Sequence, residues 1–253
     1  MATPNLFILG AGKCGTTSLY DLLGGHPDIM VSNPKEPSFF CSHFQVVKNP
    51  VDYFRLFNSP KRYRVDSSHV YFSNPETSPL LRDLFPDAKF LVMLRHPKAR
   101  AHSLYRHMRR AMHEDGRPLE LAERFHEALL LEAERFRSLE FFANCRHYFW
   151  NFMYLRSSIY DEQLDRYFRL YPRENFLVMS LAEFRREPDR VKRTVAEFLN
   201  IDVAGFGPEA PFSNAAPPHD SYDAASDAVM EQYFGNLTAR VDRLLGRSLD
   251  WSL

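Results

Sequence analysis

LFILGAGKCGTTSLYDLL, residues 6–23, is the stretch that decides the fold class. Residues 6–10 form a continuous apolar run that ends in glycine, which is typical of a strand buried in a parallel sheet. Three leucines fall on one face of a helix expected over residues 16–23, and paired glycines end it. The glycines and the lysine of the turn favour a phosphate-binding loop, since successive backbone N–H groups can point at one anion. A strand-to-helix turn without a ligand is the alternative interpretation.

Apolar strands alternate with helices along the rest of the chain. Further strands are expected at residues 29–32, 63–66, 89–94 and 176–181, and further helices before Pro86 and at 49–57, 98–112, 118–170, 189–199 and 224–245. This alternation predicts an α/β fold, with a parallel sheet flanked by helices and a P-loop-like turn after the first strand. We find no linker between independent units and therefore expect a single domain over residues 1–253.

Charge and cysteine content narrow the class of function. Lys and Arg total 32, as do Asp and Glu, so the chain lacks the positive field typical of nucleic-acid-binding proteins. The three cysteines are widely spaced and fit free thiols in a reducing cytoplasm better than a disulfide framework. No run of about 18 apolar residues exists, and the first residues do not form a secretory leader. We therefore expect a cytoplasmic protein with no nucleic-acid partner, no membrane span and no metal site.

The polar residues that follow the strands predict one ligand site. Ligands of open parallel sheets bind beyond the carboxyl ends of the strands. This rule brings four groups to one sheet edge, namely residues 13–18, Lys35 with Glu36, residues 66–68, and Arg95. The sequence therefore predicts a single site at this edge.

Arg95 indicates which kind of phosphate ligand the site would take. A loop that binds ATP with Mg²⁺ requires an aspartate at the end of a neighbouring strand. The strand over 89–94 ends in Arg95 instead, and a guanidinium binds phosphate through paired N–H groups but cannot bind a metal. Ser103 follows about two helical turns later, within reach of the same phosphate. The pattern favours a donor with an additional phosphate, with a structural ion pair for Arg95 and a surface role for Ser103 as alternatives.

Three segments together resemble a known family. GAGKCGTTSLYDLLGGHPDI at 10–29, NPKEPSFF at 33–40 and FLVMLRHPKARAHSLY at 90–105 resemble the sulfotransferases that use 3′-phosphoadenosine 5′-phosphosulfate (PAPS). The likeness is to the branch that contains heparan sulfate sulfotransferases and bacterial relatives. It covers most of the chain and is weak at 104–155 and 203–222, which are therefore expected to be acceptor or lid segments.

The resemblance implies a role for each matching residue. The 5′-phosphosulfate would be held by the first turn, and the 3′-phosphate by Arg95 and Ser103. Glu36 would act as the general base on the acceptor, and Lys13 would stabilise charge on the leaving phosphate oxygen. The product would be adenosine 3′,5′-bisphosphate, and no metal is implied. The residues of the first turn in this set are Gly12, Lys13, Cys14, Gly15, Thr16, Thr17 and Ser18, and on the acceptor side Lys35, His69 and Tyr71 are candidates.

Two departures from the family keep other functions open. Ser67 stands where heparan sulfate enzymes have a lysine, so the work of that lysine would fall to Lys35, to His69 or to no residue. The loop over 210–222 has no lysine or arginine to close over the nucleotide. A P-loop kinase that uses ATP and Mg²⁺ is one alternative, and a nucleotide-binding protein without catalysis is another. The acceptor is expected to be a small molecule, lipid or saccharide that presents a hydroxyl or, as the weaker choice, an amine.

Other residues receive mainly structural interpretations. His26, His43 and His69 are other possible bases, each of which we assign first to packing or surface. Arg106, Arg109 and Arg110 are interpreted as a solvated helix face, although they are placed to meet an anionic acceptor. The aromatic residues over 148–154 are assigned to the core, with a pocket lining as the alternative.

Overall fold

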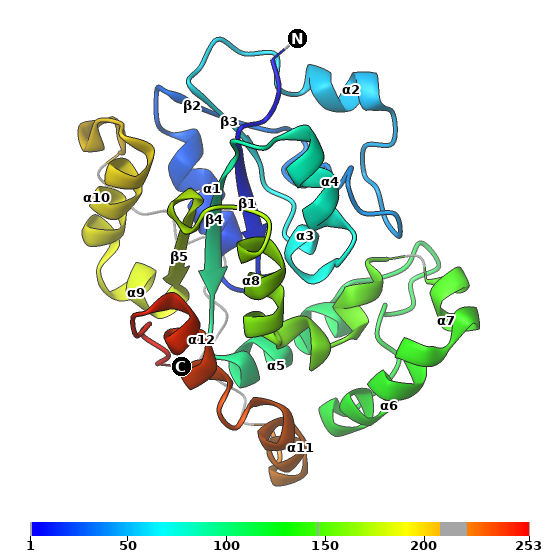
Figure 1. Cartoon of the computed structure of the whole chain (residues 1–253). Coiled ribbons are helices and arrows are strands. Elements are labelled where there is room, and N and C mark those ends of the chain that lie inside the picture. Colours follow the sequence, from blue (N-terminus) through cyan, green and yellow to red (C-terminus); the bar gives the residue numbers. More distant parts are fainter. Residues whose placement is uncertain (1, 146, 208–221, 253) are drawn as a thin grey trace.

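The fold is built on one five-stranded parallel sheet, seen in a computed structural model that describes residues 2–145, 147–207 and 222–252 (Figure 1). The strand order is β2-β3-β1-β4-β5, and every neighbouring pair is parallel. The expected fold class is confirmed. The strands are β1 (Leu6–Gly10), β2 (Ile29–Val31), β3 (Tyr63–Asp66), β4 (Lys89–Leu94) and β5 (Phe176–Ser180).

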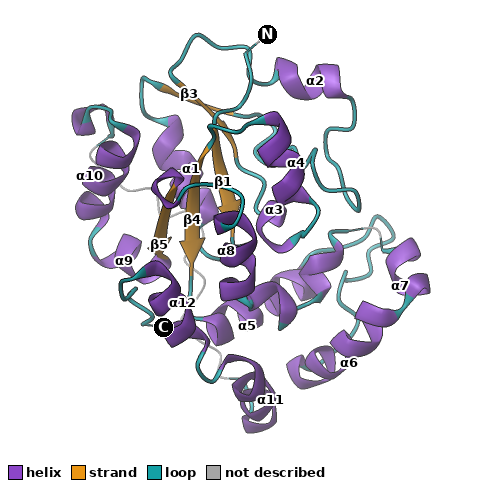
Figure 2. Cartoon of the chain, viewed as in Figure 1, coloured by secondary structure: helices purple, strands orange, loops and turns teal. Residues whose placement is uncertain are grey.

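Helices cover both faces of the sheet. In Figure 2, α8 lies in front of the strands and α1 behind them. None of the helices in the described part of the chain is long and apolar enough to cross a membrane. The helices are α1 (Thr16–Gly24), α2 (Pro50–Arg55), α3 (Val70–Ser73), α4 (Thr77–Leu84), α5 (Pro97–Arg110), α6 (Phe125–Arg137), α7 (Leu139–Asn144), α8 (Tyr160–Phe168), α9 (Leu181–Arg186), α10 (Pro188–Leu199), α11 (Ala224–Phe234) and α12 (Leu237–Leu245).

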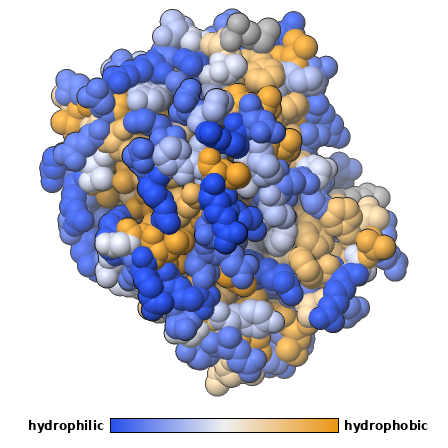
Figure 3. All heavy atoms as spheres, in the orientation of Figure 1, coloured by the Kyte–Doolittle hydropathy of each residue, from blue (hydrophilic) through white to orange (hydrophobic). Residues whose placement is uncertain are grey.

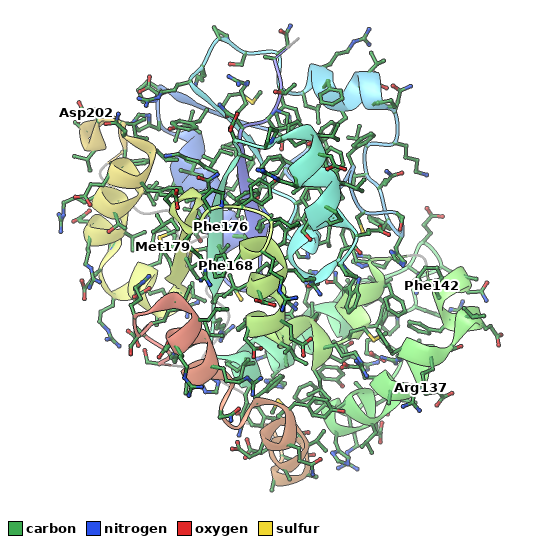
Figure 4. The ribbon with its side chains drawn as sticks, in the orientation of Figure 1. Arg137, Phe142, Phe168, Phe176, Met179 and Asp202 are labelled. Carbon is green, nitrogen blue, oxygen red and sulfur yellow. The ribbon has the colours of Figure 1, made fainter. Side chains whose placement is uncertain are left out.

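The two central strands are apolar because both of their faces are covered. All five residues of β1 are buried, and residues 90–94 of β4 are fully buried. At the edge of the sheet, Phe168 of α8 packs against Phe176 of β5 with ring centroids 4.9 Å apart (Figure 4). A core of this kind fixes the carboxyl ends of β1, β3, β4 and β5, where the polar residues of the site begin.

The long helix expected over 118–170 is wrong, because the region divides into several short elements. Ser138 caps α7 by accepting from the N–H of Phe141 at 3.0 Å, so α6 ends there. Farther along, the buried Glu132 carboxylate accepts from the N–H groups of Leu155 and Arg156, and tertiary contacts thus replace a continuous helix. The elements are α6, α7, the 3₁₀ helices η1 (Phe149–Phe152) and η2 (Arg156–Ser158), and α8.

Three other boundaries differ from the expected ones. The helix expected over 224–245 is divided at Gly235 into α11 and α12. The last strand ends at Ser180, whose hydroxyl accepts from the N–H of Glu183 at 3.0 Å and starts α9. The short helix α3 after β3 was not expected from the sequence.

The segment expected to face the acceptor lies beside the sheet, over α5, α6 and α7 (Figure 1). Figure 3 shows hydrophobic side chains on its surface, and Leu130, Leu139 and Phe142 are among the exposed ones. The aromatic residues 148, 149, 152 and 154 are buried, as the core interpretation predicts, whereas Trp150 of the same cluster is only half-buried. Of the second expected segment, residues 208–221 lie outside the described residues.

Candidate active site

The loop after β1 (residues 10–18, the glycine loop) turns sharply enough to need its glycines. Gly10 and Gly15 have φ angles of +136° and +89°, which side chains rarely allow. A Cβ at Gly12 would lie 2.6 Å from Cδ2 of His69, and one at Gly15 would lie 2.7 Å from Cδ1 of Leu181. The loop is therefore packed closely against α3 on one side and α9 on the other.

The helix that follows the loop begins without a side-chain cap. Gly15 occupies the N-cap position of α1, and no side chain accepts from the first-turn N–H groups. Such groups carry the positive end of the helix dipole and are a ready site for an anion. Thr17 is partly exposed beside them, whereas Thr16 and Ser18 are buried. The side chain of Cys14 is also buried, with Sγ 3.8 Å from the Tyr160 hydroxyl, so it faces the core.

Four basic side chains gather around this loop without a carboxylate partner (Lys13, Arg95, Arg110 and Arg185, the cationic cluster). Burial, Arg110 and Arg95 lower the pKa of Lys13, and burial and Arg95 lower the pKa of Arg185. The register explains part of the arrangement, since Leu94 of β4 pairs with Ser180 of β5, so Arg95 and α9 follow neighbouring strand ends. No ion pair joins any of the four to an acidic residue of the described chain. Like charges held together in this way favour a multiply charged anion.

Glu36 lies in the loop after β2 and bonds with two partners. Nζ of Lys35 donates to Oε1 at 2.9 Å, and Nδ1 of His69 donates to Oε2 at 2.7 Å. Burial raises the pKa of the carboxyl, but His69 and Lys35 outweigh it and lower the pKa to about 2. The carboxyl is therefore ionised at neutral pH. Since the His69 ring packs on Gly12, Glu36 is brought to the glycine loop as the sequence predicts.

A buried hydrogen-bond network supports the loop that carries Glu36. The N–H of Ser38 donates to Oγ of Ser68 at 2.9 Å, and Ser68 donates to Asp66 at 2.5 Å. Tyr71 donates to the same carboxyl at 3.1 Å and is fully buried. Burial raises the pKa of Asp66 to about 6 in spite of these donors. Tyr71 was expected on the acceptor side, but its hydroxyl is directed into the core and supports the loop instead.

Ser67 is buried, and its hydroxyl has no hydrogen-bond partner among the described residues. Lys35 and His69, the candidates to replace the family lysine at this position, both bond with Glu36. The other two histidines considered as bases lie elsewhere. Nε2 of His26 is 2.9 Å from the carbonyl of Asp202, and His43 packs against Phe142 with ring centroids 4.3 Å apart.

Sequence reasoning missed two histidines near Glu36. Burial, Lys13 and His69 lower the pKa of His107 to about 4, and burial, His69 and His107 lower the pKa of His147 to about 4. Both imidazoles are therefore neutral at pH 7. A signal for His107 exists in the sequence, because Ser103, His107 and Arg110 follow at helical spacing and share one face of α5. The sequence has no such signal for His147 or Arg185.

The comparison with protein families defines the class. A model described as "Sulfotransferase domain" matches residues 3–214. The chain belongs to the sulfotransferase domain family.

Two curated relatives illustrate its range. Human bifunctional heparan sulfate N-deacetylase/N-sulfotransferase 1 is 30% identical over 209 residues, which cover 78% of this chain and 22% of that protein. Membrane-associated sulfotransferase kil1 of Dictyostelium discoideum is 21% identical over 317 residues, covering 99% of this chain and 67% of that protein. The chain thus spans about a fifth of the length of the heparan sulfate relative.

Solved structures agree with this assignment. A sulfotransferase from Alicyclobacillus acidocaldarius superposes with a TM-score of 0.80 at 31% identity and covers 98% of both chains. Mouse sulfotransferase SULT7A1, solved in complex with PAP, has a TM-score of 0.63 at 17% identity over 96% of this chain and 87% of its own. The second likeness shows the fold alone.

Proposed function

We propose that the chain transfers a sulfuryl group from PAPS to an acceptor hydroxyl and releases adenosine 3′,5′-bisphosphate (PAP). The observation that carries the proposal is the position of Glu36. Its ionised carboxylate bonds with His69, whose ring packs on Gly12 of the anion-binding glycine loop. A base and an anion site side by side are what group transfer from a phosphorylated donor requires.

The charges and backbone of the site fit PAPS. The uncapped start of α1 and Lys13 suit a 5′-phosphosulfate, and Arg95 with Ser103 suits a 3′-phosphate. Arg185 adds a positive charge that the sequence gives no reason to expect near Arg95. We place no metal ion in the reaction, because Arg95 follows β4 where a kinase of this fold would need an aspartate.

In the proposed reaction, Glu36 takes the proton of the acceptor hydroxyl as its oxygen bonds to sulfur. The bond between sulfur and the 5′-phosphate oxygen breaks, and Lys13 offsets the charge that develops on that oxygen. His69 orients the carboxylate through Nδ1 and Lys35 through Nζ. A carboxyl pKa of about 2 keeps Glu36 ionised at neutral pH, ready to accept the proton of the acceptor.

We propose a small molecule, lipid or saccharide as the acceptor, bound at its hydroxyl rather than an amine. Neutral His107 and His147 beside Glu36 can donate and accept hydrogen bonds without attracting a polyanion such as a nucleic acid. We further propose that the enzyme acts in the cytoplasm, where the thiols of Cys14, Cys41 and Cys145 would stay reduced.

The test separates binding from transfer. We expect Glu36→Gln to lower PAPS turnover by at least about 100-fold while PAP affinity changes little, because a general base acts only in the transition state. Turnover is measured with radiolabelled PAPS and PAP affinity by calorimetry. The matched control is Glu187→Gln, which removes an exposed ion pair with Arg190.

Three results would contradict the proposal in different ways. Normal turnover by Glu36→Gln would exclude Glu36 as the base. Stabilisation against heat by ATP with Mg²⁺ but not by PAP would favour the kinase. Binding of PAP without PAPS turnover by the wild type, across a panel of hydroxyl and amine acceptors, would favour a nucleotide-binding protein without catalysis.

A further inference from the structure

Arg100 lies behind the glycine loop and carries a buried charge that is bonded only to neutral groups. It is on α5, and 1% of its surface is exposed. A buried guanidinium costs free energy unless its N–H groups have partners. Within the described chain, every hydrogen bond from its side chain goes to a backbone carbonyl or a serine hydroxyl. A buried charge without an ion pair adds little to the stability of the fold, so the contacts of Arg100 suggest another role.

The first contact fixes one peptide of the glycine loop. Nε of Arg100 donates to the carbonyl of Gly12 at 3.0 Å. Because a trans peptide is planar, its C=O and the following N–H point in opposite directions. Holding the Gly12 carbonyl toward Arg100 therefore directs the N–H of Lys13 away from Arg100. Lys13 has a φ of +69°, a left-handed conformation that helps consecutive N–H groups to converge on an anion. No carbonyl of the described residues accepts from this N–H.

The second set of contacts reaches the chain before α8. Nη1 of Arg100 donates to Oγ of Ser158 at 2.9 Å and also to Oγ of Ser157. Each serine hydroxyl donates in turn to a carbonyl, Ser158 to Tyr154 at 2.8 Å and Ser157 to Met153 at 2.5 Å. Each serine hydroxyl thus accepts from Arg100 and donates to a backbone carbonyl, so every hydrogen bond of the group has a defined donor.

Further hydrogen bonds hold the chain on both sides of η2. Tyr160, just after η2, donates from its hydroxyl to the carbonyl of Arg95 at 3.0 Å. Just before η2, the N–H of Leu155 donates to Glu132 of α6 at 2.7 Å. Arg100 therefore joins the glycine loop to η2, beside the contact of Cys14 with Tyr160.

We propose that Arg100 is a positioning residue that holds the Gly12–Lys13 peptide in its anion-binding orientation. The inference rests on the proposed function, since the anion in question is the 5′-phosphosulfate of the donor. Arg100 has no part in holding the 3′-phosphate, which lies with Arg95. Loss of Arg100 should then lower the affinity for ligands with a 5′-phosphate and leave the affinity for ligands without one unchanged.

The test compares two nucleotides. PAP carries both phosphates, whereas adenosine 3′-monophosphate lacks the 5′-phosphate. We expect Arg100→Met to bind PAP about 100-fold more weakly than the wild type, and Arg100→Lys about 10-fold more weakly. Lysine keeps the charge, but its single nitrogen cannot reach both the Gly12 carbonyl and the serine hydroxyls. The affinity for adenosine 3′-monophosphate changes by less than about twofold in both variants. Calorimetry gives both affinities.

A matched control is Arg166→Met. Arg166 is half-buried, and among the described residues it donates to neutral oxygens, the carbonyls of Phe72 and Ser73, with no hydrogen bond to the glycine loop. We expect the Arg166→Met variant to unfold more easily than the wild type but to bind both nucleotides with wild-type affinity. If Arg100→Met does not fold, Arg100→Lys alone decides the question.

The outcomes separate this inference from the function on which it rests. If the wild type does not bind PAP, the proposed function fails and the inference fails with it. If the wild type binds PAP and the Arg100 variants bind it equally well, only the inference is wrong. A parallel loss of affinity for both nucleotides would also overturn it, because a merely structural role weakens the whole site.

Discussion

The pKa of Glu36 depends on one neighbour more than on any other. Burial alone would raise it, and His69 accounts for most of the lowering to about 2. In His69→Ala we expect the pKa of Glu36 to rise, so that the carboxylate is lost at a higher pH than in the wild type. PAPS turnover should then fall on the acid side at a pH where the wild type is still active. Rate profiles from about pH 4 to about pH 8 measure the difference.

His43→Ala is the control for this experiment, because His43 packs against Phe142 and does not bond with Glu36. A loss of activity by His69→Ala that is equal at every pH would show that His69 does more than tune Glu36. In that case His69 itself would be the candidate for the proton acceptor.

At the level of single residues, the sequence predicts those that follow a strand. Lys13, Glu36 and Arg95 lie in the loops that follow recognisable apolar runs, so the sheet topology brings them to one edge. His147 could not be predicted, since it reaches the site only through the packing of the irregular chain before η1. Tyr71 was misplaced because the sequence does not tell which residues of a short unexpected helix face the core.

At the level of elements, α6 is fixed by a buried acid. Glu132 accepts from the N–H groups of Leu155 and Arg156 at 2.7 and 2.8 Å, and burial raises its pKa from 4.5 to about 7. Because the folded state keeps this proton to a higher pH than the unfolded chain, the contribution of Glu132 to stability is full below about pH 4.5 and is lost as the pH rises through about 7. The expected decline is about 3 kcal/mol.

Glu132→Gln should remove this part of the pH dependence. Urea unfolding of the wild type and the variant, measured across the same pH range, gives the difference between their slopes. Glu140→Gln on the surface of α7 is the control and should follow the wild type. Equal slopes for the wild type and Glu132→Gln would mean that Glu132 ionises as readily in the folded protein as in the unfolded chain.

The same acid explains why the helix expected over 118–170 was wrong. Apolar periodicity records that residues are buried on one side, which several short helices can satisfy as well as one long one. The breaks are set by contacts between distant residues, such as those of Glu132, and by the Ser138 cap. The strands were easier to predict, because residues buried on both faces form unbroken apolar runs.

For the whole molecule, one continuous core predicts one unfolding event. The buried residues of the described chain extend from β1 to the last helix in a single cluster. We expect a single cooperative thermal transition, which tests the expected single domain. PAP at about 100 times its dissociation constant should stabilise the protein by about 2.7 kcal/mol and raise the midpoint by about 5–10 °C. Two separate transitions, with only one shifted by PAP, would contradict this expectation.

The neighbouring strands β4 and β5 have a consequence for how such proteins diversify. A crossover between parallel strands needs about a dozen residues, yet this one contains α5 to α8 and the 3₁₀ helices η1, η2 and η3 (Arg173–Asn175). The part of this surplus that carries none of the proposed donor-binding residues contains α6 and α7, between α5 and η1. Because Lys13, Glu36, Arg95 and Ser103 all lie outside α6 and α7, we expect this part to be exchangeable between relatives, so that a new acceptor preference evolves while the donor site is kept.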